Sequence, residues 1–242
     1  MKKIVLLAAM AALTAGFATA QTTGKDRLKE LEEKAAEVKQ HKKANMAGNL
    51  FSCEAFTHVA YGWHNVEGDA FRSKFGPSGE FFFNAFELSF NPAFWLSLSA
   101  GLDLGWNYYK LNKDNYFDVQ SDNSLDIIAA GLETWKSSKL RSFDLAVPAM
   151  ISFKFDWFSL RFGAEAVFPM NGRNTVISKY SQGGDSYDVR TKGGELEKSF
   201  LRYLAVIDFD GLGIIYKYCP EAIVPGSEMI KSCQTLGIIL SL

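Results

Sequence analysis

The side chains that most often carry out chemistry are sparse in this sequence. Its 242 residues include only three histidines, His41, His58 and His64, and no nucleophile motif of the G-x-S-x-G type. His64 stands beside Asn65 and Glu67 in what we expect to be a loop, but a catalytic site there would also need a nucleophile. We therefore expect no catalytic, cofactor-binding or metal site and no enzymatic activity.

Composition and charge narrow the function classes further. The chain carries 26 basic and 27 acidic residues, for a net charge of −1, so no excess of positive charge points to nucleic acid. Hydrophobic residues make up 48 % and charged residues 22 %, which excludes a disordered chain. The high counts of phenylalanine and glycine, 20 residues each, are unusual for a chain of this length.

An alternation of apolar and polar residues dominates the chain after residue 48. From Phe94 to Tyr109, Leu, Phe, Ala and aromatic residues occupy every second position, with Ser, Gly, Asp and Asn between most of them. This period of two predicts β-strands. We expect eight strands, at residues 50–61, 82–90, 94–109, 142–155, 158–168, 201–209, 212–219 and 233–242.

Long and short connections alternate between these strands. The long polar segments are 62–79, 110–139, 170–199 and 220–231, and tight turns separate them at 91–93, 156–157 and 210–211. The turns predict that Phe209 pairs with Leu212 and that Phe90 pairs with Phe94. An even number of antiparallel strands can close into an up-and-down barrel. A ten-stranded alternative stays open, because the segment from Ile127 to Leu132 could add strands.

The more continuous face of the strands is the apolar one. The interior of an eight-stranded barrel holds side chains only, so it has no room for all of these Leu and Phe residues. We therefore expect the apolar face to point outward into lipid, as in a transmembrane β-barrel.

Two further segments precede the barrel, which we place at 49–242. Residues 1–20 combine Lys2 and Lys3 with an apolar stretch and an Ala-Thr-Ala cleavage site, which predicts a secretory signal peptide. Residues 21–48 are rich in Lys, Glu and Ala with helical spacing, which predicts a short N-terminal helix as a periplasmic linker.

The strand pattern, the unequal connections and the C-terminal strand Thr235–Leu242 resemble the small OmpA/OmpX-like outer-membrane β-barrels. The resemblance is closest to the outer membrane protein beta-barrel domain proteins of Bacteroidetes, grouped with the porin family, and covers about residues 49–242. It implies the Gram-negative outer membrane as location. It also implies outer-membrane lipid, lipopolysaccharide and the assembly machinery as partners. Such barrels usually end in an aromatic residue, whereas this chain ends in Leu242.

Charged residues on the inward faces are expected to pair across strands, because an unpaired charge in a narrow lumen is costly. We expect Arg161 near Glu87, and Arg202 and Lys217 near Glu165 and Glu54. The predicted lumen network consists of Glu54, His58, Glu87, Asp103, Asp144, Lys154, Arg161, Glu165, Arg202, Asp208 and Lys217.

Cys219 and Cys233 flank the last long connection and fall side by side in the expected register. Because a secreted chain meets an oxidising compartment, we predict a disulfide between them, with free thiols as the alternative. Cys53 is left over near the opposite rim.

The long loops offer most of the surface on which a barrel displays function. We expect a structural or surface-binding role for an unidentified extracellular ligand, with the lumen plugged by charged side chains. A narrow porin for small solutes is the alternative, and a lipid-modifying enzyme is less favoured.

Overall fold

A computed structural model describes residues 50–67, 78–112, 115–129, 135–182, 185–225 and 232–242. The expected signal peptide and helical linker lie outside the described residues. The described strands are β1 (Phe51–Ala55), β2 (His58–Glu67), β3 (Ser78–Ala93), β4 (Leu96–Lys110), β5 (Asn115–Val119), β6 (Leu125–Ala129), β7 (Trp135–Lys154), β8 (Ser159–Pro169), β9 (Thr175–Gln182), β10 (Asp185–Lys192), β11 (Phe200–Phe209), β12 (Leu212–Cys219) and β13 (Ser232–Ser241), with a short 3₁₀ helix η2 (Asn171–Arg173).

Eight of these strands form a closed antiparallel ring. Their order around the ring is β2, β3, β4, β7, β8, β11, β12 and β13, and β13 pairs back onto β2 from Ser232 opposite Glu67 to Ser241 opposite His58. The eight-stranded up-and-down barrel is thus confirmed. Strand β1 extends β2 below an irregular step at Phe56, whose φ is +54°, and pairs with β3.

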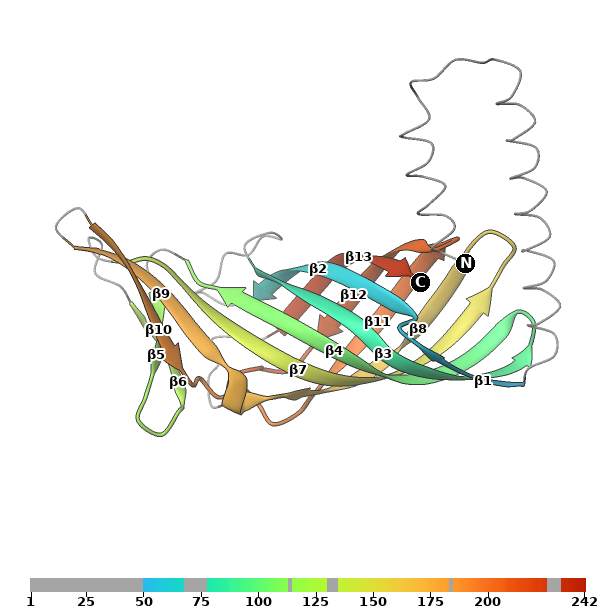
Figure 1. The fold of residues 1–242 in the computed structure, drawn as a ribbon, viewed down its shortest axis with the longest axis horizontal. Coiled ribbons are helices and arrows are strands. Elements are labelled where there is room, and N and C mark those ends of the chain that lie inside the picture. The colour runs from blue at the N-terminus through green and yellow to red at the C-terminus, as the bar shows by residue number, and fades with distance from the viewer. Residues whose placement is uncertain (1–49, 68–77, 113–114, 130–134, 183–184, 226–231) are drawn as a thin grey trace, which may run out of the picture.

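The remaining strands project beyond the barrel at its long-loop end (Figure 1). Strands β5 and β6 form one two-stranded hairpin, and β9 and β10 form a second hairpin that pairs with the upper part of β7. These strands belong to the long connections and add none to the ring, so the barrel does not reach ten strands.

Strand register follows the predicted turns in two hairpins of three. Phe209 pairs with Leu212 across Asp210-Gly211, and Phe155 N–H donates to the Phe158 carbonyl across Asp156-Trp157.

The third hairpin corrects the expected pairing of Phe90 with Phe94. Phe90 pairs with Leu98, because the chain turns at 94–95 and shifts register between Phe90 and Ala93. Pro92 lies within that shifted stretch and has no N–H to donate to a regular ladder.

Burial separates the two faces of the barrel wall. On β4, Leu98 is 43 % exposed, whereas its neighbours Ser97 and Ser99 are 3 % and 9 % exposed. Ile214 on β12 is 51 % exposed, and the flanking Gly213 and Ile215 are buried. Apolar side chains therefore cover the outside of the barrel. Among the described residues, no helix is long and apolar enough to span a membrane.

Candidate functional site

The middle of the lumen holds two acidic and two basic side chains in mutual contact. Arg202 on β11 lies 2.9 Å from the Glu80 carboxylate and 2.5 Å from the Glu165 carboxylate. Lys217 Nζ on β12 lies 2.9 Å from Glu80 and 3.4 Å from Glu165. We call these four residues the central quartet. It balances two positive against two negative charges, and each side chain is at most 8 % exposed.

A cation–π contact and the strand pairing hold the quartet in place. Lys217 Nζ lies 3.5 Å from the ring centroid of Phe82, a cation–π contact with the residue below Glu80 on the inner face of β3. Glu165 and Arg202 stand directly opposite each other in the β8–β11 ladder. Strand pairing therefore fixes the positions of the charges before the side chains meet.

The lumen near the short-turn end holds a second set of polar contacts. Arg161 Nη2 donates to both oxygens of Glu87, at 3.1 and 2.9 Å, as the sequence predicted for this pair. His58 Nε2 lies 3.8 Å from Asp103, which also accepts a hydrogen bond from the Asn84 amide.

Four of the predicted network residues lie apart from these two sets. Lys154 Nζ donates to Asn91, Asp144 accepts from the Asn107 amide at 2.6 Å, and Asp208 accepts from the hydroxyl of Ser241. Glu54 is exposed and stands opposite Glu87 in the β1–β3 ladder. The expected contact of Glu54 with Arg202 and Lys217 is therefore wrong, and Glu80 takes its place.

A register shift explains why sequence reasoning missed Glu80. The alternation in β3 changes phase between Asn84 and Phe86, so Phe82 faces inward while Phe86 faces outward. The extra residue at this β-bulge makes the pattern look mixed, and Glu80 fell outside the strand that we expected to begin at Phe82. The signal was the inward row of Ser78, Glu80 and Phe82.

His64 was also misplaced by the sequence analysis. It belongs to β2 rather than to a loop and is 1 % exposed. Its ring nitrogens hydrogen-bond to Thr235 at 2.8 Å and Asn107 at 3.1 Å, and the ring stacks on Tyr109. Because both ring nitrogens are hydrogen-bonded and the ring is stacked, His64 belongs to the packed interior of the barrel.

Apolar layers lie on both sides of the central quartet. A cluster that includes Phe82, Leu204 and Ile215 separates it from the Arg161–Glu87 pair, and a larger cluster fills the long-loop end of the lumen. The larger cluster joins barrel residues such as Tyr109 to side chains of the long connections, including Leu196 and Ile223. The cavity between the quartet and the short-turn end has a volume of about 20 Å³, roughly the space of one water molecule.

Cys219 and Cys233 stand directly opposite each other where β12 and β13 leave the barrel. Both are buried, and both are free thiols in this structure, as is the exposed Cys53. The positions agree with the register that the sequence predicted. The covalent bond itself stays a prediction.

We propose that these two thiols are oxidised to a disulfide when the protein folds in an oxidising compartment. The bridge closes a connection of about 13 residues, for which loop-closure entropy gives roughly 3 kcal/mol of stabilisation. Peptide mass spectrometry without reductant should find Cys219 linked to Cys233. Dithiothreitol should then lower the free energy of unfolding, but not in a Cys219→Ala/Cys233→Ala variant. Free thiols at both positions in the native protein would contradict the prediction.

The outer surface of the barrel carries aromatic rows near each end. Towards the long loops, Trp106 packs against Phe143 with ring centroids 5.0 Å apart and against Phe81 at 6.0 Å. Towards the short turns, Trp157 stacks on Phe209 at 5.9 Å. The distribution matches the two aromatic girdles that flank the lipid-facing band of membrane barrels.

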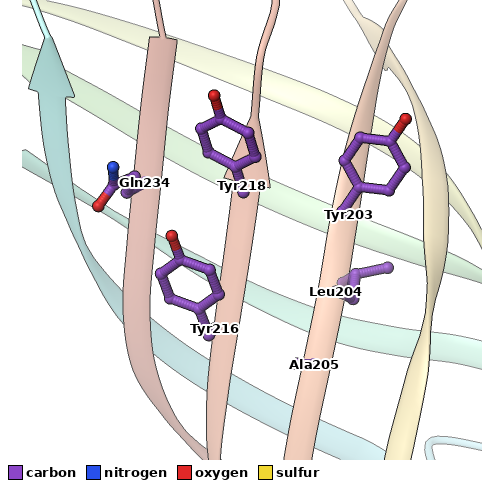
Figure 2. A pocket seen from close by; sticks show the side chains of 6 residues that line it. All are labelled: Tyr203, Leu204, Ala205, Tyr216, Tyr218 and Gln234. Atoms are coloured by element: carbon purple, nitrogen blue, oxygen red, sulfur yellow. The ribbon is translucent and has the colours of Figure 1, made fainter.

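A groove of about 440 Å³ interrupts the outer surface over β11, β12 and β13 (Figure 2). It lies where Ala205 leaves space between larger outward side chains, and the rings of Tyr203, Tyr216 and Tyr218 form its walls. The three phenol groups point the same way, towards the long-loop end, where Gln234 adds an amide (Figure 2). The groove therefore combines an apolar floor with polar groups at one end.

Among the described residues, no group of three or more His, Cys, Asp or Glu side chains could hold a metal ion. The fold and the interior together define a class: a closed eight-stranded antiparallel β-barrel with an apolar exterior and a charged interior.

No protein-family model and no curated protein matches this sequence. Among solved structures, Ail, the attachment invasion locus protein of Yersinia pestis, aligns with a TM-score of 0.35 and 14 % identity over 79 % of this chain and 97 % of that chain, in a complex with the heparin analogue sucrose octasulfate. Neisserial surface protein A (NspA) aligns with a TM-score of 0.37 and 9 % identity over 80 % of this chain and 98 % of that chain. The fold assignment rests on the strand pairing of this chain itself.

Proposed function

We propose that this chain is an integral outer-membrane β-barrel with a closed lumen and no enzymatic activity. Its role is structural or surface-binding and is carried by the hairpins at the long-loop end. This end faces the outside of the cell, and the short turns face the periplasm. Residues 1–20 direct export, and the barrel belongs with the small OmpA/OmpX-like proteins.

The exposed apolar exterior supports the membrane location. Phe162, Ile207, Ile214 and Ile238 are between 41 and 51 % exposed on four different strands. A surface of this kind would aggregate in water and is stable in hydrocarbon. Outer-membrane lipid and lipopolysaccharide are the partners that this surface would contact.

The ring-closing strand supports assembly by the outer-membrane machinery. On β13 the outward side chains Leu236, Ile238 and Leu240 are 42, 47 and 47 % exposed, and Leu242 beyond it is 61 % exposed. The strand thus keeps an unbroken apolar outer row from Leu236 to Leu242.

The observation that best supports a closed lumen is the layered packing of side chains around the central quartet. An apolar cluster, a neutralised set of four charges and a second apolar cluster follow one another along the axis. The cavity beside the Arg161–Glu87 pair, about 20 Å³ in volume, has room for roughly one water molecule. Closure leaves the outer surface and the hairpins as the parts available for binding.

The projecting hairpins support a surface-binding role. All eight residues of β10 are exposed, and among the described strands β10 pairs with β9 alone, as an edge strand. The β5–β6 hairpin forms a second small sheet, which packs against β7 through a hydrogen bond from Phe117 N–H to the Ser138 hydroxyl. Such a display of strands on a rigid barrel is the usual arrangement for recognition at a cell surface.

Three measurements test the proposal. The purified protein should migrate differently on SDS gels before and after boiling, as folded membrane barrels do, and should insert into lipid vesicles. In a planar lipid bilayer it should give no stable conductance steps. Stable open channels in the wild-type protein would support the narrow-porin alternative and contradict the closed lumen.

A further inference from the structure

One face of the projecting sheet gathers basic side chains from four strands. Above the barrel rim, β4, β7, β9 and β10 pair in that order, and residues that stand opposite each other share a face. Lys110 stands opposite Lys139, and Arg190 joins the same row through Ile177. Arg173 lies at the lower edge of these rows. We call the whole set the basic face, and it consists of Lys110, Lys139, Arg141, Arg173, Lys179, Arg190 and Lys192.

Arg173 connects this face to the aromatic row of the barrel. Its guanidinium lies 5.4 Å from the ring centroid of Phe143. Phe143 pairs with Trp106 in the β4–β7 ladder, and Arg141 follows two residues further towards the loops. The step is about 7 Å along the strand.

The basic face carries far more positive than negative charge. Its register rows contain one acid, Asp188, which pairs with Lys179 at 3.3 Å. Among the described residues, no carboxylate lies within 4.0 Å of the other six basic side chains. All seven are exposed except Lys139, which is half-buried.

Crowding of like charges makes this arrangement costly. Two lysines directly opposite each other on neighbouring strands repel, and such pairs destabilise a sheet. The pKa of Lys139 is lowered, first by its partial burial and then by the positive charges of Arg141, Lys179 and Lys110. Bound anions would remove this repulsion.

We propose that the basic face binds the phosphate groups of outer-leaflet glycolipids, the lipid A class of head group. Its lower edge starts next to the aromatic row, and a bilayer head-group layer is roughly 5–7 Å thick on each side. Arg141 and Arg173 therefore lie at the depth of lipid phosphates. Lys139, Lys179 and Arg190 reach further out, where phosphorylated core sugars extend, whereas Lys192 lies in the register row of Arg141. This inference rests on the proposed membrane location and orientation.

The test uses the purified protein in phosphatidylcholine nanodiscs and measures retained lipid by native mass spectrometry. The probes are diphosphoryl lipid A, monophosphoryl lipid A and soluble heparin fragments. The variant is Lys139→Gln/Arg141→Gln, and the control is Lys136→Gln/Lys198→Gln, which removes two exposed positive charges outside the basic face. Boiling-dependent gel migration verifies that each variant is folded.

We expect the wild type and the control to retain diphosphoryl lipid A more strongly than the monophosphoryl form. The Lys139→Gln/Arg141→Gln variant should bind diphosphoryl lipid A about thirtyfold more weakly, since each basic residue near an anionic surface is worth about 1 kcal/mol. Binding should also weaken with added salt.

Two results would overturn the inference. Equal retention by wild type and variant would remove the basic face as the binding site. Heparin binding that depends on these residues, without lipid A retention, would assign the face to a soluble polyanion. Failure of every form to enter the nanodisc would instead refute the proposed membrane location, so the two failures are distinguishable.

Discussion

Replacing Glu165 by glutamine is expected to lower the free energy of unfolding by about 3–5 kcal/mol, because it leaves a buried positive charge without its partner. Glu165 is 0 % exposed and contacts both Arg202 and Lys217. In its absence, these two cations share the single carboxylate of Glu80. Urea unfolding of the protein in lipid vesicles, followed by tryptophan fluorescence, measures the change.

Glu54→Gln is the matched control for this variant. Glu54 is exposed, so the same chemical change should alter the free energy of unfolding by less than about 0.5 kcal/mol. A double variant, Glu165→Gln/Lys217→Gln, restores neutrality and should be less destabilised than the sum of its two single changes. A fully additive double variant, or a neutral Glu165→Gln, would mean that the quartet does not act as one charge-balanced unit.

Introducing arginine at Val147 should destabilise the membrane-inserted protein by about 2–4 kcal/mol, the cost of a charge near the middle of the lipid-facing band. Val147 is 44 % exposed on the outer face of β7. It lies between the aromatic row at Phe143 and the one at Phe153, which stacks on Trp95. Unfolding in phospholipid bilayers and boiling-dependent gel migration both report the effect.

Val189→Arg provides the comparison for this change. Val189 is 40 % exposed on β10, beyond the barrel, where an added charge meets water. We expect a change below about 0.5 kcal/mol there. If Val147→Arg were equally harmless, the apolar exterior would not face hydrocarbon, and the membrane location would be refuted.

The regular strands could be read from the sequence because their period is local. In β4 and β7 every outward Leu or Phe alternates with a small or polar inward residue, so strand, face and approximate length follow from the order of residues alone. The same holds for the Asp210-Gly211 turn, whose residue types specify a two-residue hairpin. The ion pair of Arg161 with Glu87 could be predicted since both lie near short turns, from which register can be counted.

Other features required the tertiary structure. The β-bulge after Asn84 reverses the alternation in β3, and nothing in the local sequence marks the residue at which the phase changes. Only the pairing of β3 with β2 and β4 shows that Glu80 faces the lumen and belongs to the quartet.

The long connections were also predictable only in part. Their length and polarity identified them as loops, but the β9–β10 hairpin pairs with β7, and apolar side chains of the connections fill the barrel mouth. The sequence by itself determined the alternation, and so the eight strands and the outward direction of the apolar side chains, since a period of two is a property of neighbouring residues. Only the tertiary structure decided which charges meet, because ring closure and stagger bring together residues as distant as Glu80 and Arg202.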